Sequence, residues 1–223
     1  MVRVLPSGVP AVASAERAEE KEAAAGYNAN AALVEALFGN RGEARQLARS
    51  ALRRATGRDV QYSAALALVL AGDESQARIV VDDLGKRFPE DTTVQFNYLP
   101  TLRAQLALSH NDARQAGVAL QNATAYELGA TLYPAYFRGI AYLAAHRGGD
   151  ATVEFQKVLD HRGIVLNDPI GALARLGLAR AYASQGNTPQ VQAAYQDFLT
   201  LWKDADPDIP ILKQAKAENA KLH

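Results

Sequence analysis

The feature that most constrains this chain is a pattern of small and large residues that recurs five times along it. A copy has a small residue, a larger residue three positions later, a turn, and then a second run that begins with a small or apolar residue. The third copy is more degenerate, because Ala107 stands where the larger residue is expected. The first small residues are separated by 33, 39, 35 and 40 positions, and they are Ala32, Ala65, Ala104, Gly139 and Ala179. A period of about 34 residues with insertions in alternate connections predicts paired helices that bury their apolar faces only by stacking on neighbouring pairs.

Turns are predicted between the two runs of each copy, because glycine, asparagine and aspartate end helices and open turns. They are placed at Gly39-Asn40, Gly72-Asp73, Asn111-Asp112, Gly148-Gly149 and Gly186-Asn187. Two helices joined by such a turn approach closely only where side chains are small, so Ala65, Gly139 and Ala179 are expected to face the second helix of their copy. The side chains expected to fill the gaps between pairs are Tyr142, Phe155, Tyr182, Tyr195 and Phe198.

Local signals favour helix over strand along the whole chain. Asp168-Pro169 is typical of a helix N-cap followed by proline at the first helical position. The β-branched run from Arg78 to Val81 falls inside a helical period, and the alanine-rich stretches favour helix. Two connections are longer than the minimal repeat needs, at 125–133 and 161–167. We therefore expect an all-α fold without a sheet.

Composition excludes several classes of function. Lys plus Arg and Asp plus Glu are 24 each, so no net field favours nucleic acid or an anionic membrane. The chain has no cysteine, which excludes disulfides, thiolate zinc sites and a thiol nucleophile. No stretch approaches the roughly 20 apolar residues that cross a bilayer. Pro6 and Pro10 interrupt what would be the apolar region of a signal peptide.

The order of small and large residues resembles the tetratricopeptide (TPR) signature, with Pro89 where that repeat commonly ends its second helix. The resemblance implies a right-handed α-solenoid of about five TPR-like helical hairpins with a C-terminal capping helix. We expect an N-terminal helical segment at 1–26 that is the remnant of an upstream repeat, a TPR-like array at 27–206, and the capping helix at 207–223. The expected repeats are 27–57, 58–90, 91–131, 132–166 and 167–206.

A more specific likeness covers the segment from Tyr133 to Leu222. It resembles the C-terminal TPR arrays of bacterial Ser/Thr protein kinases and winged-helix regulators, a type common in acidobacteria. The strings that carry it are Tyr133–Tyr136, Phe155–Gly163 and Leu201–Pro210, and Ala36–Asn40 and Tyr126–Gly129 extend it. The glycine-rich loop, the lysine strand and the Asp-Phe-Gly motif of a kinase are missing from this sequence. The chain is therefore expected to be either a piece of a longer protein or a free-standing relative.

No catalytic, cofactor or metal site is predicted. The four histidines, at 110, 146, 161 and 223, are not at ligand spacing. Asp204–Asp208 resembles the start of a calcium loop, but Ile209 and Ala215 stand where a glycine and a bidentate glutamate are needed. Phosphate-loop, nucleophile-elbow and dinucleotide fingerprints are missing. We expect a protein that is not an enzyme and needs no cofactor.

The remaining candidate is the concave groove that the first helices of such repeats line. By register, the residues beside the packing positions are expected to face it, and aromatic residues spaced along a groove can anchor a peptide. The alternative is that several of the tyrosines simply pack between repeats. The positions by which chaperone-binding arrays clamp a terminal carboxylate are not matched, so a chaperone C-terminus is not the expected ligand. The candidate groove residues are Tyr62, Leu66, Tyr98, Gln105, Tyr133, Tyr136, Ile140, Leu176 and Arg180.

These observations predict a cytoplasmic, non-enzymatic protein-interaction scaffold, the accessory array of a bacterial signalling or regulatory protein. It is expected to bind a protein or peptide, to contact no nucleic acid, to span no membrane, and to be a monomer or weak homodimer. Two alternatives stay open. One is the sensing region of a transcriptional regulator, and the other is a structural module that self-associates.

Overall fold

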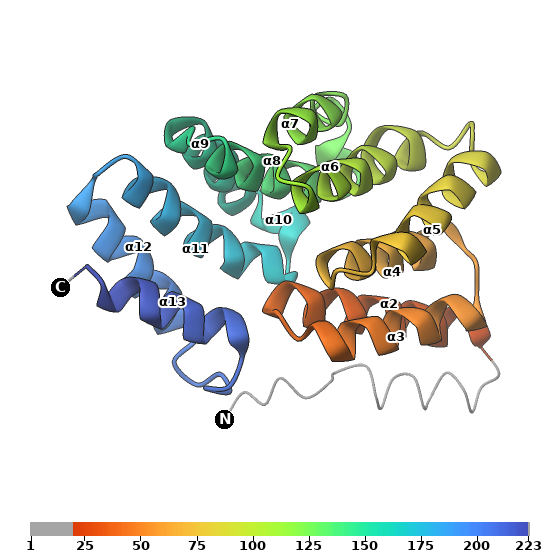
Figure 1. Cartoon of the computed structure of the whole chain (residues 1–223), viewed down its shortest axis with the longest axis horizontal. Helices are drawn as coiled ribbons and strands as arrows, with labels where there is room; N and C mark the ends of the chain where they lie inside the picture. The colour runs from red at the N-terminus through yellow and green to blue at the C-terminus, as the bar shows by residue number, and fades with distance from the viewer. Residues whose placement is uncertain (1–19, 223) are drawn as a thin grey trace. The chain divides into compact units, whose positions relative to one another are not determined.

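The computed structural model describes residues 20–222, and these residues form an entirely helical fold (Figure 1). They contain twelve α-helices, one π-helical turn and one 3₁₀ turn, and no β-strand is present among them. The prediction of an all-α fold is confirmed. The predicted segment at 1–26 lies largely outside the described residues, and so does His223.

The helices follow one another with short connections. In chain order they are α2 (Lys21–Phe38), α3 (Arg41–Arg54), α4 (Arg58–Leu70), α5 (Glu74–Arg87), the π-helical turn η1 (Val94–Tyr98), α6 (Leu99–Ser109), α7 (Ala113–Gln121), the 3₁₀ turn η2 (Glu127–Gly129), α8 (Tyr133–Ala144), α9 (Gly148–Asp160), α10 (Arg162–Val165), α11 (Pro169–Ser184), α12 (Thr188–Leu201) and α13 (Pro210–Ala220).

The chain divides into two compact units. The first comprises the described residues up to Leu102 together with Ala205–Ile211, and the second comprises Arg103–Asp204 together with the residues from Leu212. The division falls inside α6. Each unit is described separately below.

In the first unit, α2 packs against both α3 and α4, and α4 packs against both α3 and α5. Alanine makes this close packing possible. Ala32 of α2, Ala44 and Ala48 of α3, and Ala65 of α4 are all fully buried. The π-helical turn η1 precedes Pro100, whose ring cannot sit beside the carbonyl of residue 96 in a regular α-helix. The wider turn accommodates the proline at the start of α6.

In the second unit, α8 packs against α7, α9 and α11, and α11 packs against α9 and α12. The centre of this packing is Phe155 of α9, which is fully buried. A Cβ atom added to Gly139 of α8 would lie 2.7 Å from the Phe155 ring, and one added to Gly177 of α11 would lie 2.6 Å from it. The ring therefore occupies space that exists only because both residues are glycine.

One turn joins the two helices of each of the five hairpins, and all five turns share one backbone conformation. The residue that ends the first helix is left-handed in every case, with φ of 94°, 82°, 60°, 57° and 71° at Gly39, Gly72, Asn111, His146 and Gly186. The next residue donates its backbone N–H to the carbonyl five positions earlier, at 2.8–3.1 Å in all five turns. This is the Schellman arrangement that satisfies the last carbonyls of a helix.

Four of the five predicted turns are confirmed, and the prediction at Gly148-Gly149 is wrong. The left-handed residue there is His146, and both glycines lie in the first turn of α9. Gly148 is small for a different reason. A Cβ atom on Gly148 would meet the side chain of Ser184 and would lie 2.9 Å from the carbonyl oxygen of Ala181 at the end of α11.

Several predicted boundaries can be compared with the observed helices. The predicted repeats each contain one of the five hairpins, but α2 begins at Lys21, so the predicted start of the array at 27 falls inside this helix. The two long connections contain short helical elements, η2 and α10. The predicted N-cap at Asp168 is confirmed, because its carboxylate accepts the N–H of Ile170 at 3.0 Å.

Candidate functional site

The candidate groove residues lie on the first helices of their hairpins, but most of their side chains are covered. Ile140 of α8 and Arg180 of α11 are partly exposed. The other seven are at most 8% exposed, and they are Tyr62, Leu66, Tyr98, Gln105, Tyr133, Tyr136 and Leu176. Such burial favours the packing interpretation for the tyrosines. Contact of any of the nine with a partner stays a prediction.

In the first unit, two of these tyrosines form a stack. The rings of Tyr62 and Tyr98 lie 3.8 Å apart between centroids and are nearly parallel. The Tyr98 hydroxyl donates to Asp59 at 2.9 Å, and Arg58 forms ion pairs with Asp59 and Asp91. Burial, followed by the negative charge of Asp59, raises the pKa of Tyr98. The pair thus ties η1 to α4.

In the second unit, Tyr133 and Tyr136 at the start of α8 have different surroundings. The Tyr133 hydroxyl donates to both oxygens of Asp168 at 3.0 Å. Burial raises the pKa of Asp168, against the lowering effect of the bonds from the Ile170 amide and from Tyr133. Tyr136 is packed against Phe137 and Phe155, and its burial raises its pKa to about 12. Both tyrosines help to hold α8 in place.

Arg180 is occupied by a carboxylate of the same unit. Its Nε and Nη2 atoms bind the two oxygens of Glu218 in α13 at 3.0 and 3.1 Å, and the Tyr195 hydroxyl donates to Glu218 at 2.9 Å. Burial raises the pKa of Glu218, but the bonds from Arg180 outweigh it and leave this pKa below its usual value. Helix α13 therefore covers part of the last hairpin through an ion pair as well as through its buried Leu212 and Ala215.

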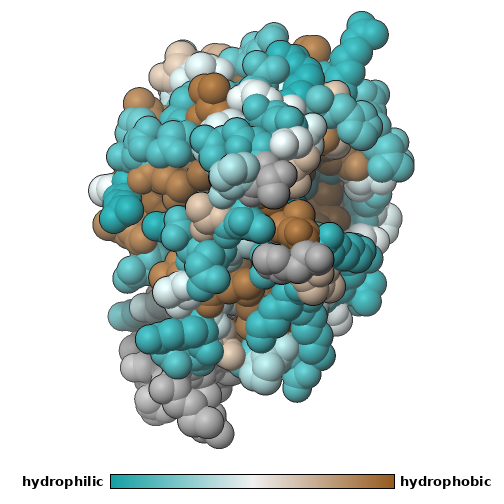
Figure 2. Space-filling view, turned by 90° about the vertical axis from the view of Figure 1, so that its left-hand side faces the viewer, coloured by the Kyte–Doolittle hydropathy of each residue, from teal (hydrophilic) through white to brown (hydrophobic). Residues whose placement is uncertain are grey.

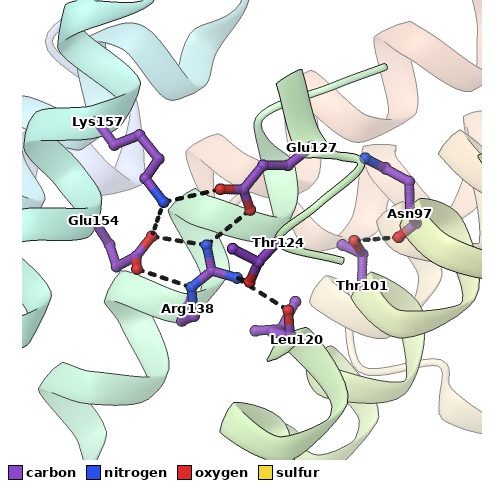
Figure 3. A network of polar contacts seen from close by, with 8 residues as sticks. All are labelled: Asn97, Thr101, Leu120, Thr124, Glu127, Arg138, Glu154 and Lys157. Atoms are coloured by element: carbon purple, nitrogen blue, oxygen red, sulfur yellow. Dashed lines mark hydrogen bonds and ion pairs between the residues drawn. The ribbon is translucent and has the colours of Figure 1, made fainter. Parts of the chain in front are cut away.

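A buried ionic network connects η2 to α8 and α9 (Figure 3). Arg138 binds Glu127 at 2.7 Å and Glu154 at 2.9 Å, and it also donates to the backbone carbonyl of Leu120. Lys157 binds the free oxygen of Glu127 at 2.9 Å. Burial opposes the charge of Arg138, but the hydrogen bonds to Glu154 and Glu127 outweigh it and raise the pKa of Arg138.

The network was not predicted from the sequence. Glu127 does lie in the predicted long connection at 125–133. The charges of the network balance, because Arg138 and Lys157 neutralise the carboxylates of Glu127 and Glu154. Its side chains therefore hold the connection onto the hairpin. The spacing of Glu154 and Lys157 on one helix was the only local signal.

The described residues hold no cluster of metal ligands and no helix suited to crossing a membrane. Between residues 20 and 222, no three His, Asp or Glu side chains come close enough together to hold a metal ion. His110 and His146 are exposed, and the Nδ1 atom of His161 lies 2.8 Å from the carbonyl oxygen of Lys157. In the same range, no helix combines the length and the apolar character that crossing a bilayer requires.

A buried side-chain nitrogen on the predicted groove, that of Gln105, is left without a hydrogen bond within the described residues. The residue lies in α6 and is 5% exposed. Gln105 follows Ala104 directly, as Ile140 follows Gly139 and Arg180 follows Ala179. Ile140 and Arg180 are the two candidates that retain exposed surface. Neither a family model nor a curated protein nor a solved structure matches the chain.

Proposed function

We propose that this chain is a non-enzymatic protein-interaction scaffold built as a right-handed solenoid of TPR-like hairpins. The observation that carries the proposal is the repetition of one turn at Gly39, Gly72, Asn111, His146 and Gly186. Each of these residues follows the first small residue of its copy by seven positions, so the sequence period and the backbone period coincide. A repeat of this kind supplies an extended surface for partners. Other repeat proteins use such a surface to bind their partners.

The partner is a protein or peptide, and the system is bacterial signalling or regulation. This part rests on the resemblance to the arrays of Ser/Thr kinases and winged-helix regulators. Ile140 and Arg180 are the residues proposed to contact the partner, because they keep exposed surface on two helices, α8 and α11, that pack together. An acidic segment of a partner would have to displace Glu218 before it could bind the guanidinium of Arg180.

The alternatives are a sensing region and a self-association module. Figure 2 shows apolar residues in separate patches among hydrophilic ones on the face that it draws, rather than one broad apolar surface. A stable homodimer commonly needs a larger continuous apolar area. A sensing region predicts a thermal shift with its metabolite, since a ligand at 100 times its Kd adds about 2.7 kcal/mol to the free energy of unfolding.

The test is quantitative capture of partners from a bacterial lysate with matched variants. Ile140→Ser removes an apolar contact from the proposed surface, and Ile79→Ser removes an isoleucine that is 62% exposed on α5. A partner that is bound by the wild type and by the Ile79 variant, but lost with the Ile140 variant, supports the proposal. In calorimetry, the purified partner must then bind the wild type and the Ile79 variant more tightly than the Ile140 variant. Equal binding by all three chains, or turnover of a phosphoester or peptide by the purified chain, would contradict it.

A further inference from the structure

A second candidate site lies in the second unit. It is a pocket of about 700 Å³ between α9, α10, α11 and α12. This volume falls within the range of about 300–1,000 Å³ that is usual for small-ligand sites. None of its lining residues belongs to the predicted groove. They are Gln156, Leu159, Asp160, Arg162, Gly163, Arg175, Leu178, Tyr182, Gln190, Ala193, Ala194 and Asp197.

The connection at 161–167 forms one wall of the pocket. It folds into α10, and its Val165 is buried against α11, where a Cβ on Gly171 would lie 2.9 Å from the Val165 side chain. This packing fixes Arg162 and Gly163 beside the pocket. The connection ends at Leu166, which has φ 50° and ψ −121°, a conformation that is strained for a residue with a side chain. Repeat packing alone does not require this connection, so the strain and the wall together indicate a purpose in it.

The lining carries charges of both signs, and their sum is zero. Arg162 and Arg175 are positive, and Asp160 and Asp197 are negative. Arg162 and Asp197 are exposed, and within the described residues neither side chain forms a hydrogen bond or an ion pair. They lie on different helices, α10 and α12. The balance disfavours polyanions such as nucleotides and also polycations, because either would leave two like charges against it.

The lining also contains apolar groups. Leu178 and Ala194 are buried, and Leu159 and Tyr182 are partly exposed. A ligand that fits this lining has an apolar middle with a carboxylate at one end and an ammonium at the other. A short peptide has this chemistry, because its side chains supply the apolar part and its backbone can bond Gln156 and Gln190 at the rim.

We propose that the pocket binds a short peptide with opposite charges at its two ends, its carboxylate on Arg162 and its ammonium on Asp197. The charges come either from the free termini of a small peptide or from flanking acidic and basic side chains in a segment of a larger protein. The site is separate from Ile140 and Arg180. Its failure and the failure of the interaction-scaffold proposal are therefore distinguishable.

The test is a titration of the full chain, followed by backbone amide NMR shifts and calorimetry, with four peptides of one length. The first is Ala-Leu-Leu-Ala with free termini, the second is the same peptide acetylated and amidated, the third is acetyl-Lys-Leu-Leu-Glu-amide, and the fourth is acetyl-Gln-Leu-Leu-Gln-amide. We expect either the first or the third to bind, with shifts confined to α9–α12, and the two uncharged peptides to bind at least fivefold more weakly. Binding of the first alone identifies a free peptide as the ligand, and binding of the third identifies a protein segment.

Two single variants and two matched controls locate the site. Arg162→Ala and Asp197→Ala are each expected to weaken binding about two- to fivefold, as expected for a partly exposed charge pair. Arg45→Ala and Asp82→Ala remove exposed charges of the first unit that also lack partners within the described residues, and we expect no change from them. Binding that is equal for charged and uncharged peptides, unchanged affinity in both pocket variants, or no binding by any of the four peptides would overturn the proposal.

Discussion

The first and fourth hairpins use the same turn but fill the space between their helices in opposite ways. In the α2–α3 hairpin, Ala32 and Ala48 are both fully buried, and the two helices approach through methyl groups. In the α8–α9 hairpin, the corresponding residues are Gly139 and Phe155, separated by the same 16 positions. One large ring and one missing side chain replace two small side chains. Gly177 of the next hairpin completes the cavity for the ring.

This difference shows which part of the hairpin depends on side chains. The turn is held by backbone hydrogen bonds, which are the same with glycine, asparagine or histidine as the left-handed residue. The packing, in contrast, depends on the sizes of the side chains between the two helices, and different hairpins fill this space with different combinations of residues. The fourth hairpin also buries charge, since Arg138 and Glu154 occupy the positions that Ala31 and Leu47 hold in the first. Its stability should therefore respond far more strongly to single substitutions.

The largest expected effect is that of Phe155→Ala. Removing a fully buried ring between two glycines leaves a cavity that backbone cannot fill, so the free energy of unfolding should fall by about 3–5 kcal/mol. Urea unfolding followed by the fluorescence of Trp202, which stacks on Phe198 in the same unit, measures it. The counterpart Ala48→Gly in α3 should cost only about 0.5–1 kcal/mol, measured by circular dichroism. Equal losses would show that the two hairpins are packed alike after all.

A loss of similar size is expected for Arg138→Met. The substitution leaves Glu127 and Glu154 buried with only Lys157 as a cation, and breaking a buried ion pair in this way costs about 3–5 kcal/mol. Arg147→Met is the matched control, because the Arg147–Asp150 pair is about half exposed on both sides. The control should lose no more than about 1 kcal/mol in the same urea titration. If the two variants lose equally, the network does not stabilise the fourth hairpin.

A smaller effect is expected for Gly139→Ala, which tests the space between α8 and the ring. Alanine normally stabilises a helix relative to glycine, but here its Cβ would lie 2.7 Å from Phe155, so a net loss of about 1–3 kcal/mol is expected. Adding Phe155→Leu should recover part of that loss, and the double-mutant cycle measures the coupling between the two sites. Gly26→Ala in α2 meets no atom within 4 Å and should stabilise the first hairpin instead. A harmless Gly139→Ala would contradict the cavity described above.

Much of the fold was readable from the sequence because the repeat has a fixed internal spacing. The helices, four of the five turns and the buried positions of the second helices follow from that spacing. The turn of the fourth hairpin was predicted at the wrong position, because two adjacent glycines are a strong turn signal in a sequence. The seven-residue offset from Gly139 points to His146 instead. A fixed offset within a repeat therefore locates a turn better than residue type does.

The candidate site was much less predictable, and the reason is that register identifies a helix face but not what covers it. Tyr62 was placed correctly on α4, yet it is covered by the stacked ring of Tyr98 from η1. Arg180 was placed correctly on α11, yet Glu218 of α13 binds it. The Arg138 network joins residues of three separate segments, and the only pair within it at helical spacing is Glu154 with Lys157. Contacts between segments have to come from the structure.

The smallest effect concerns the turn that both hairpins share. His146 has φ 57°, a left-handed conformation that costs a residue with a side chain about 1–2 kcal/mol relative to glycine, so His146→Gly should stabilise the second unit by about 1 kcal/mol after the entropy cost of glycine. The reverse change, Gly72→Ala, introduces no contact within 4 Å and should destabilise the first unit by about 1–2 kcal/mol through the backbone alone. If His146→Gly raises the free energy of unfolding and Gly72→Ala lowers it, the hairpins share the backbone geometry of the turn and not a particular side chain. A destabilising His146→Gly would instead mean that the imidazole contributes contacts of its own, and the two hairpins would then differ in their turns as well as in their packing.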